Sequence, residues 1–233
     1  LKNAYTHLLP DQNFRHTIET NLDPLIRLGI PIKNKKVKID WSDKDDEIIN
    51  KELLNFDKFI HIHPVSRWLF KCINDKMMAK IIDFCEHELD CKVVLTSDSN
   101  KYEINKINKI LSYCSSNPLN LSGRLTLKQT AALNKRAKLF IGVDSAANNV
   151  PVFAFFGPSG ADHWGPWDNN YQTSGYSERN GKQSMGMHRV FSESRACQPC
   201  GKDGCNGSKI SDCLMNMNFN NIKEDIQEMV NEH

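Results

Sequence analysis

Leu139-Phe140-Ile141-Gly142-Val143 is an unbroken run of apolar and small residues, and Pro151-Val152-Phe153-Ala154-Phe155-Phe156 is a second run of the same kind. Neither run alternates polar with apolar positions, as a strand with one solvent-exposed face would. Continuous apolar runs of this length are typical of strands in parallel sheets that helices cover on both faces. The two runs therefore predict the centre of such a sheet.

Upstream of these runs, the chain alternates between short apolar strands and amphipathic helices. Apolar residues predict strands at 59–62 and 93–96, and three- and four-residue apolar spacing predicts helices at 74–89, 101–113 and 126–137. This order predicts an α/β protein with a Rossmann-like parallel sheet. Ligands of such sheets bind beyond the carboxyl ends of the strands, so the polar residues after each strand are the candidates for function.

The connection between the two central strands is short for this fold. Seven residues, Asp144 to Val150, separate the strands, whereas a parallel crossover needs a dozen or more. Either the two strands pair antiparallel, or a helix is absent between Asn148 and Asn149 in the sequence as given. We favour the second interpretation, because Asp144-Ser145-Ala146-Ala147-Asn148 is typical of a capped first helical turn.

Composition indicates a globular protein with a sizeable core. The 233 residues are 39% hydrophobic and 25% charged, and the net charge of +2 gives no general case for nucleic-acid binding. No apolar run approaches the roughly 20 residues that span a bilayer. The chain begins with neither Met nor an apolar leader, so we expect a segment of a longer chain.

One basic cluster stands out against this balanced composition: Lys33, Lys35, Lys36 and Lys38. A charge run of this kind is ordinarily a solvated edge. The functional alternative is a contact with an anionic membrane surface or a glycolipid acceptor.

The eight cysteines fall into two groups. Four are scattered in or beside predicted helices and strands, which indicates reduced core thiols of a cytosolic protein: Cys72, Cys85, Cys91 and Cys114. The other four are clustered and begin with a Cys-x-x-Cys knuckle: Cys197, Cys200, Cys205 and Cys213. Their second pair lacks the two-residue spacing of a typical zinc site, so bound zinc, packed thiols and a disulfide stay open as alternatives.

The segment after the first predicted strand carries three groups that suit a phosphate. It reads His63-Pro64-Val65-Ser66-Arg67-Trp68-Leu69-Phe70-Lys71. Ser66 offers a hydroxyl donor, Arg67 a planar fork of N–H groups and Lys71 a point charge. The alternative is a solvated loop whose Trp68 and Phe70 are tucked into the core.

Two later strand ends carry weaker signals. In Gly142-Val143-Asp144-Ser145-Ala146, small residues and a predicted helix start let backbone N–H groups approach a diphosphate. Asp144 repels phosphate, so we expect it to cap the helix or to bind a sugar hydroxyl. After the last predicted strand, Trp164 and Trp167 either stack on a ligand or pack in the core, and His163 is expected to be a hydrogen-bonded scaffold.

Together these segments resemble glycosyltransferase family 9, the ADP-heptose:lipopolysaccharide heptosyltransferases, and within it the heptosyltransferase III type most. The similar stretches are HTIETNLDPL (16–25), HPVSRWLFK (63–71), LFIGVDSAA (139–147), VFAFFGP (152–158) with HWGPW (163–167), and CQPCGKDGC (197–205). They span nearly the whole chain in the family's order, and the ordered set is more specific than any one stretch.

The resemblance implies a GT-B architecture, in which two Rossmann-like domains enclose the active site. It implies that residues 1–42 are the tail of the N-terminal domain and a linker. Residues 43–218 are then the C-terminal, nucleotide-sugar-binding donor domain, and residues 219–233 are a C-terminal helix. Most of the N-terminal domain, which holds the family's catalytic Asp, lies outside this sequence. We therefore expect the chain as given to bind the donor but to be inactive alone.

The resemblance also implies which residues bind the donor: Ser66, Arg67, Lys71, Glu103, Leu125, Asp144, Ser145 and Ala146. Lys71 is the implied catalytic group, because its charge balances the departing ADP. Glu103 is expected to hold the ribose or adenosine and Leu125 to line the adenine pocket. One departure concerns the helix that follows Asp-Ser-Ala-Ala-Asn in the family, because its phosphate-binding His is absent here.

The implied reaction is the inverting transfer of L-glycero-D-manno-heptose from ADP-heptose to the lipopolysaccharide inner core, with no metal and no cofactor. The implied partners are the ADP-heptose donor and the lipopolysaccharide core acceptor, at the cytoplasmic face of the inner membrane, with no nucleic acid. Three alternatives stay open: a GT-B transferase for another nucleotide sugar, a non-catalytic nucleotide-sugar-binding or scaffold module, and a zinc-organised interaction domain.

Overall fold

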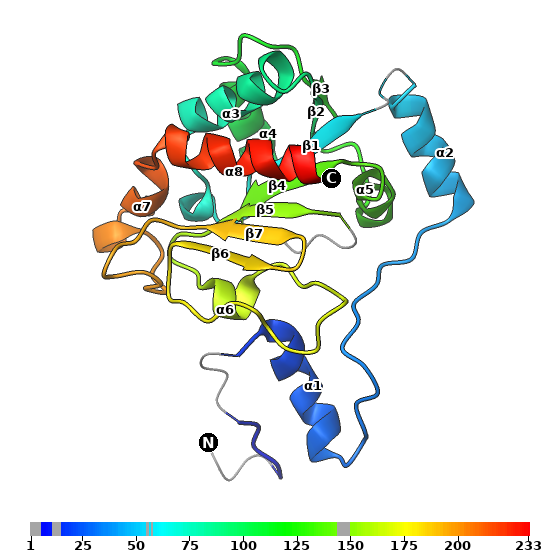
Figure 1. The fold of residues 1–233 in the computed structure, drawn as a ribbon, viewed down its shortest axis with the longest axis vertical. Helices are drawn as coiled ribbons and strands as arrows, with labels where there is room; N and C mark the ends of the chain where they lie inside the picture. Colours follow the sequence, from blue (N-terminus) through cyan, green and yellow to red (C-terminus); the bar gives the residue numbers. More distant parts are fainter. Residues whose placement is uncertain (1–5, 11–14, 55, 57, 144–149) are drawn as a thin grey trace.

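The computed structural model describes residues 6–10, 15–54, 56, 58–143 and 150–233. In Figure 1 a single sheet forms the centre, and helices lie on both of its faces. Within the described part of the chain, no helix is both long and apolar enough to cross a membrane.

The sheet has seven strands in the order β3-β2-β1-β4-β5-β7-β6. Every neighbouring pair is parallel except β6 and β7, which form an antiparallel hairpin at one edge. The strands are β1 Phe59–His63, β2 Lys92–Leu95, β3 Leu119–Asn120, β4 Leu139–Val143, β5 Val152–Phe155, β6 Lys182–Met185 and β7 His188–Phe191. The predicted Rossmann-like parallel sheet is thus confirmed.

The two central apolar runs pair parallel, as β4 and β5. Their register places Phe140 beside Val152 and Val143 beside Phe155. The antiparallel alternative is therefore wrong, and the chain must return across the sheet between Val143 and Val152. Residues 144–149 of that connection lie outside the described residues, so the expectation of an absent helix there stays a prediction.

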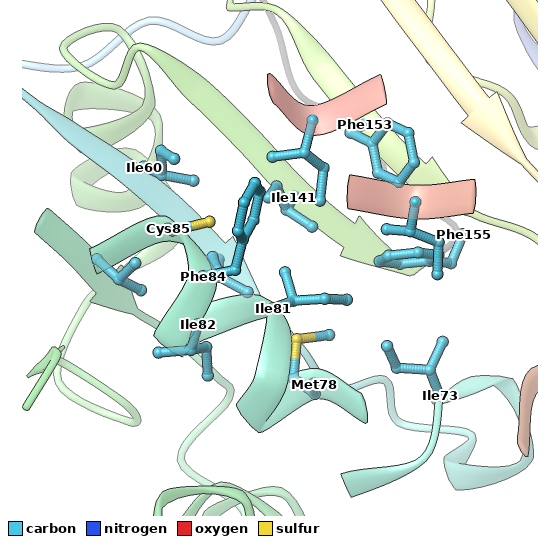
Figure 2. Packing of buried hydrophobic residues seen from close by; sticks show 14 of the residues in the cluster. Ile60, Ile73, Met78, Ile81, Ile82, Phe84, Cys85, Ile141, Phe153 and Phe155 are labelled. Carbon is cyan, nitrogen blue, oxygen red and sulfur yellow. The ribbon is translucent and has the colours of Figure 1, made fainter. Parts of the chain in front are cut away.

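One face of the sheet is covered by α3 (Asp75–His87), α4 (Lys101–Leu111) and α8 (Phe219–Glu232). Asn74 caps α3 through its side chain, and α3 then buries Met78, Ile81, Ile82 and Cys85 at helical spacing. Figure 2 shows these side chains packed against residues of β1, β4 and β5. Each aliphatic side chain buried in this way stabilises the fold by about 1.5–3 kcal/mol relative to exposure.

The opposite face is covered in two parts. Over β1 and β2 lie α2 (Asp43–Glu52) and α5 (Leu127–Asn134), which bury a cluster that includes Phe59 and Val94. Over β4, β5 and β7 lies the segment that contains α6 (Ala161–Trp164), with Trp167 and Tyr176 buried beneath it. Because neighbouring strand residues point to opposite faces, even and odd positions of β1 enter different clusters.

Residues before the first strand lie along this second face. The helix α1 (Thr17–Arg27) begins at His16, whose buried ring contacts Trp167 at 4.8 Å between ring centroids. Farther on, the Asn169 side chain accepts a hydrogen bond from the Val37 N–H and donates one to the Val37 carbonyl, both at 2.9 Å. The segment after α1 is therefore joined at Val37 to the residues that follow α6.

The shorter elements are two 3-10 turns, Leu69–Lys71 and Cys205–Gly207, and the helix α7 (Asp212–Met215). Sequence reasoning missed α2 and the β6–β7 hairpin. The signal for α2 is the capping box of Ser42 and Asp45, in which each side chain accepts a hydrogen bond from the other residue's backbone N–H. The signal for the hairpin is Gly186, which has a positive φ of 56° in the turn.

Candidate functional site

The strand order places a topological switch point between β1 and β4. From β1 the chain moves outward to β2 and β3, and it then returns to the other side of β1 as β4. Open α/β sheets bind ligands at such a switch point. The register places His63 beside Gly142, so the ends of these two strands are neighbours.

The carboxyl ends of four strands point the same way. The strands β2, β1, β4 and β5 are consecutive and mutually parallel, so residues 62, 96, 143 and 156 all lie at one edge of the sheet. β7 is parallel to β5 as well, and therefore the segment after Phe191 starts at the same edge. Sequence analysis did not include this fifth segment, because β7 was not predicted.

The segment after β1 presents Arg67 and Lys71 on a loop anchored by Phe70. Phe70 is buried, whereas Trp68 is 52% exposed, so the alternative that places both aromatic rings in the core is wrong for Trp68. The Arg67 guanidinium lies 5.5 Å from the centroid of the Trp68 ring. Ser66 is half-buried, and its hydroxyl accepts a hydrogen bond from the Trp68 N–H at 3.3 Å.

Two cavities flank this loop. One, of about 510 Å³, is lined by Arg67 and by residues at the start of α4, Glu103 among them. The other, of about 540 Å³, is lined by Lys71 together with the segment after β5 and residues 199–203. The structure therefore brings Arg67 and Glu103 together and places Lys71 on the other side of the same loop.

Glu103 lies in the first turn of α4 and is 4% exposed. Its Oε2 accepts a hydrogen bond from the Asp98 N–H at 2.8 Å, and its own N–H donates to Asn100 Oδ1 at 3.0 Å. A carboxylate in the first turn of a helix is stabilised by the positive end of the helix dipole. Glu103 thus fixes the turn between β2 and α4 and still lines the cavity beside Arg67.

A hydrogen-bonded chain of four side chains lies directly beneath the loop. His61 Nδ1 is bonded to Asn134 Oδ1, His61 Nε2 lies 2.6 Å from Thr96 Oγ1, and His63 Nδ1 lies 2.9 Å from the same hydroxyl. The Asn134 oxygen only accepts, so His61 carries its proton on Nδ1 and accepts the Thr96 hydroxyl proton at Nε2. The hydroxyl must then accept from His63 Nδ1, which leaves His63 Nε2 unprotonated.

Burial keeps both of these histidines neutral. Desolvation lowers the pKa of His61 to about 3, and it also lowers the pKa of His63, against the opposing charge of Glu103. Both histidine rings are therefore neutral at neutral pH, and their hydrogen bonds determine which nitrogen of each ring carries the proton. Sequence reasoning missed it, because Thr96 and Asn134 are far from His61 in the chain.

Leu125 follows the turn at Gly123, which packs against Ile104 and Ser99 at the start of α4. It is half-buried against the cluster beneath α2 and α5, directly before the Thr126 cap of α5. It is not among the described residues that line the two cavities. Its predicted adenine contact stays a prediction, and Asp144, Ser145 and Ala146 lie outside the described residues.

The segment after β5 packs closely on the rest of this edge. A Cβ on Gly157 would lie 2.6 Å from the buried Leu214 side chain, so this position favours glycine, whereas a Cβ on Gly160 would require the Asp162 carboxylate, 2.2 Å away, to rotate. The ring of His163 donates from Nδ1 to the Arg15 carbonyl at 2.6 Å, which agrees with the predicted scaffold role. Trp167 is buried, whereas Trp164 is 47% exposed.

All eight cysteines are reduced in the structure. Cys72, Cys85 and Cys91 are buried and Cys114 is half-buried, which agrees with the predicted core thiols. In the later cluster, Cys197 and Cys200 are exposed and Cys213 is buried. Among residues 6–10, 15–54, 56, 58–143 and 150–233, no three His, Cys, Asp or Glu side chains are placed to hold a metal ion.

The basic cluster near the linker is partly neutralised. Lys35 pairs with Glu19 at 2.6 Å, and Lys38 pairs with Asp40. Lys33 and Lys36 are exposed. Since Lys38 and its partner Asp40 are exposed too, this arrangement agrees with the solvated-edge interpretation for three of the four lysines.

Fold and site together are typical of doubly wound α/β proteins that hold a phosphorylated ligand at the switch point of the sheet. Residues 4–193 match the profile of glycosyltransferase family 9, the heptosyltransferases. This match covers most of the sequence, and the chain belongs to glycosyltransferase family 9. The resemblance predicted from the sequence is thus confirmed.

Individual relatives agree with this assignment. Lipopolysaccharide heptosyltransferase 3 of Escherichia coli is 32% identical over 179 residues, which are 72% of this chain and 52% of that protein. The chain thus spans about half the length of this curated relative.

Solved structures share the fold. A glycosyl transferase family 9 protein from Veillonella parvula superposes with a TM-score of 0.73 at 19% identity, over 98% of this chain and 63% of that one. The E. coli heptosyltransferase WaaC, solved with ADP, gives a TM-score of 0.54 at 16% identity, over 96% of this chain and 59% of that one.

Proposed function

We propose that this chain is the donor-binding part of a heptosyltransferase that takes L-glycero-D-manno-heptose from ADP-heptose. The observation that carries the proposal is the loop after β1, which presents Arg67 to one cavity and Lys71 to the other at the switch point of the sheet. Family membership and the ADP held by WaaC support an adenine nucleotide as the ligand.

In the proposed complex, the nucleoside lies on the Arg67 side of the loop and the sugar on the Lys71 side. Glu103, already ordered by the Asp98 N–H, offers its carboxylate to the ribose hydroxyls. The diphosphate crosses the loop between the two cavities, next to Ser66. The predicted contacts of Leu125, Asp144, Ser145 and Ala146 complete this proposal.

The proposed chemistry is an inverting displacement at the anomeric carbon. As the bond to the β-phosphate oxygen breaks, negative charge grows on the departing ADP, and Lys71 and Arg67 are positioned to stabilise it. Side-chain cations therefore take the part that a metal ion plays in other transferases. We propose that the acceptor hydroxyl is deprotonated by a group outside these 233 residues.

We propose the lipopolysaccharide inner core as the acceptor, since the curated relative is a lipopolysaccharide heptosyltransferase. The enzyme would then act in the cytoplasm, peripheral to the inner membrane. Exposed Lys33 and Lys36 are the residues of the basic cluster that remain to face an anionic surface.

Titration calorimetry of the chain with ADP, ADP-heptose and UDP-glucose tests the donor assignment. We expect ADP to bind at least about tenfold more tightly than UDP-glucose. Replacing Lys71 by Ala should weaken ADP binding by about tenfold or more, because a charge-assisted hydrogen bond of roughly 1.5–3 kcal/mol is lost.

The matched control is Lys51→Ala, an exposed lysine on α2, which should leave all three affinities unchanged. Equal binding of UDP-glucose and ADP would remove the adenine assignment. Absence of binding to any of the three would leave only the fold established.

A further inference from the structure

We propose that residues 199–203 form the wall of the pocket in which the sugar half of the donor is recognised, with Lys202 and Trp164 as its contacts. This inference rests on the proposed function and deepens it. The segment belongs to the cysteine-rich stretch 197–213, for which the donor-binding assignment offers no role.

Three segments of the described part of the chain line the cavity of about 540 Å³ on the Lys71 side. One is the loop after β1, and the second is the segment after β5, which supplies His163 and Trp164. The third is the stretch 199–203, which supplies Lys202 and Asp203. Because β1, β5 and β7 all end at this edge of the sheet, the three walls follow from the strand order.

The third wall is held firmly in place. Gln198 is 1% exposed, and its side-chain amide donates to the Gly157 carbonyl at 3.3 Å. The Gly201 N–H donates to the Pro158 carbonyl at 2.9 Å. On the other side, Asn180 Nδ2 donates to the Gln198 carbonyl at 3.3 Å. A wall fixed before the ligand arrives loses little conformational entropy on binding.

The charge on this wall comes from Lys202. Asp203 is already paired with Lys209 at 2.8 Å, whereas Lys202 is exposed and makes no ion pair within the described residues. Its three N–H donors therefore lie at a cavity in which Asp203, already paired with Lys209, is the one carboxylate among the described lining residues. Such a group binds hydroxyls or a phosphate oxygen of a ligand.

The apolar part of the pocket comes from two exposed indoles. Trp164 and Trp68 line the cavity, 47% and 52% exposed, respectively. The ring of His163 lies edge-on to Trp164 at 4.5 Å between centroids, and its Nδ1 donates to Arg15, which leaves Nε2 as an acceptor. A sugar has an apolar C–H face and a rim of hydroxyls, and this pocket offers both kinds of partner.

The test compares ADP-heptose with ADP, because only the former carries the sugar. We expect Lys202→Met, which keeps the aliphatic stem and removes the charge, to weaken ADP-heptose binding about tenfold. ADP binding should change less than about twofold. Lys202→Arg should restore most of the loss. Trp164→Ala should also weaken ADP-heptose selectively, whereas Trp164→Phe keeps an aromatic face and should lose less.

The control is Lys51→Met on α2, and a thermal melt of each variant checks that it is folded. If ADP still binds while Lys202→Met and Trp164→Ala leave ADP-heptose affinity unchanged, the sugar is recognised elsewhere. That result would overturn this inference but not the proposed function. Equal losses for ADP and ADP-heptose would also overturn it, because Lys202 would then bind phosphate and not sugar. If wild-type chain binds neither ligand, the proposed function fails with it.

Discussion

At the scale of single residues, polar side chains beneath the site are as constrained as the apolar core. The sequence placed His63 next to the candidate loop, but it gave no sign that His61, Thr96 and Asn134 join it in one hydrogen-bonded chain. These contacts connect β1, β2 and α5, and they become visible only when the strand register is known. Local motifs therefore predict the groups that face a ligand better than those that support them.

Removal of the Thr96 hydroxyl should show how much these buried side-chain hydrogen bonds contribute to the stability of the fold. In Thr96→Val, the buried His61 Nε2 and His63 Nδ1 both lose their partner, and we expect a loss of about 2–3 kcal/mol in the free energy of unfolding. Urea denaturation at pH 7.5 measures it. The matched control is Thr130→Val, whose hydroxyl donates only to the Thr126 carbonyl one helical turn earlier, and which should lose less than about 1 kcal/mol. Similar losses in both variants would show that these buried hydrogen bonds contribute no more to the free energy of unfolding than an exposed hydrogen bond on a helix.

At the scale of elements, hydrophobic periodicity predicted the main strands and helices, since their apolar spacing is set by the core that they face. Their ends differed by a few residues: the helix predicted at 126–137 is Leu127–Asn134. The hairpin β6–β7 was missed because most of β6 is polar, with only Met185 buried. As a result, the segment 199–203 was not recognised as part of the site.

The docking of α1 depends on one histidine. His16 Nδ1 accepts the Ile18 N–H at 3.2 Å as the helix cap, and Nε2 donates to the Gly165 carbonyl at 2.8 Å. His16→Ala removes both bonds, so we expect α1 and the linker to detach locally while the sheet stays folded. Limited proteolysis should then cut between residues 28 and 42 several times faster than in the wild type. His7→Ala, at an exposed position, should not change the rate. Unchanged cleavage in His16→Ala would mean that other contacts, such as those of Asn169 with Val37 and of His163 with Arg15, hold this segment.

At the scale of the whole molecule, three buried histidines and the half-buried His63 should make stability depend on pH. Burial is the first cause that lowers the pKa of His16, His61, His63 and His188, to about 3 for His61 and about 4 for His188. A histidine with a lowered pKa in the folded state contributes fully above its ordinary value of 6.5 and loses that contribution as the pH falls toward the folded value. Stability should therefore fall between pH 6.5 and pH 4, by up to about 1.4 kcal/mol per pH unit for each histidine.

Urea midpoints at pH 7.5, 6.0 and 5.0 measure this dependence. His61→Gln removes one of the four titrating groups and should flatten the slope, whereas exposed His87→Gln should not. A slope that is unchanged in His61→Gln would show that His61 takes up no proton on unfolding.

The two edges of the sheet carry a consequence for how larger assemblies are built. β3 is only two residues long, and β6 is largely polar and begins with Lys182, so neither edge offers a long apolar strand for another chain to extend. Another chain that docks on this protein would therefore contact it through side chains and not by extending its hydrogen-bonded ladder.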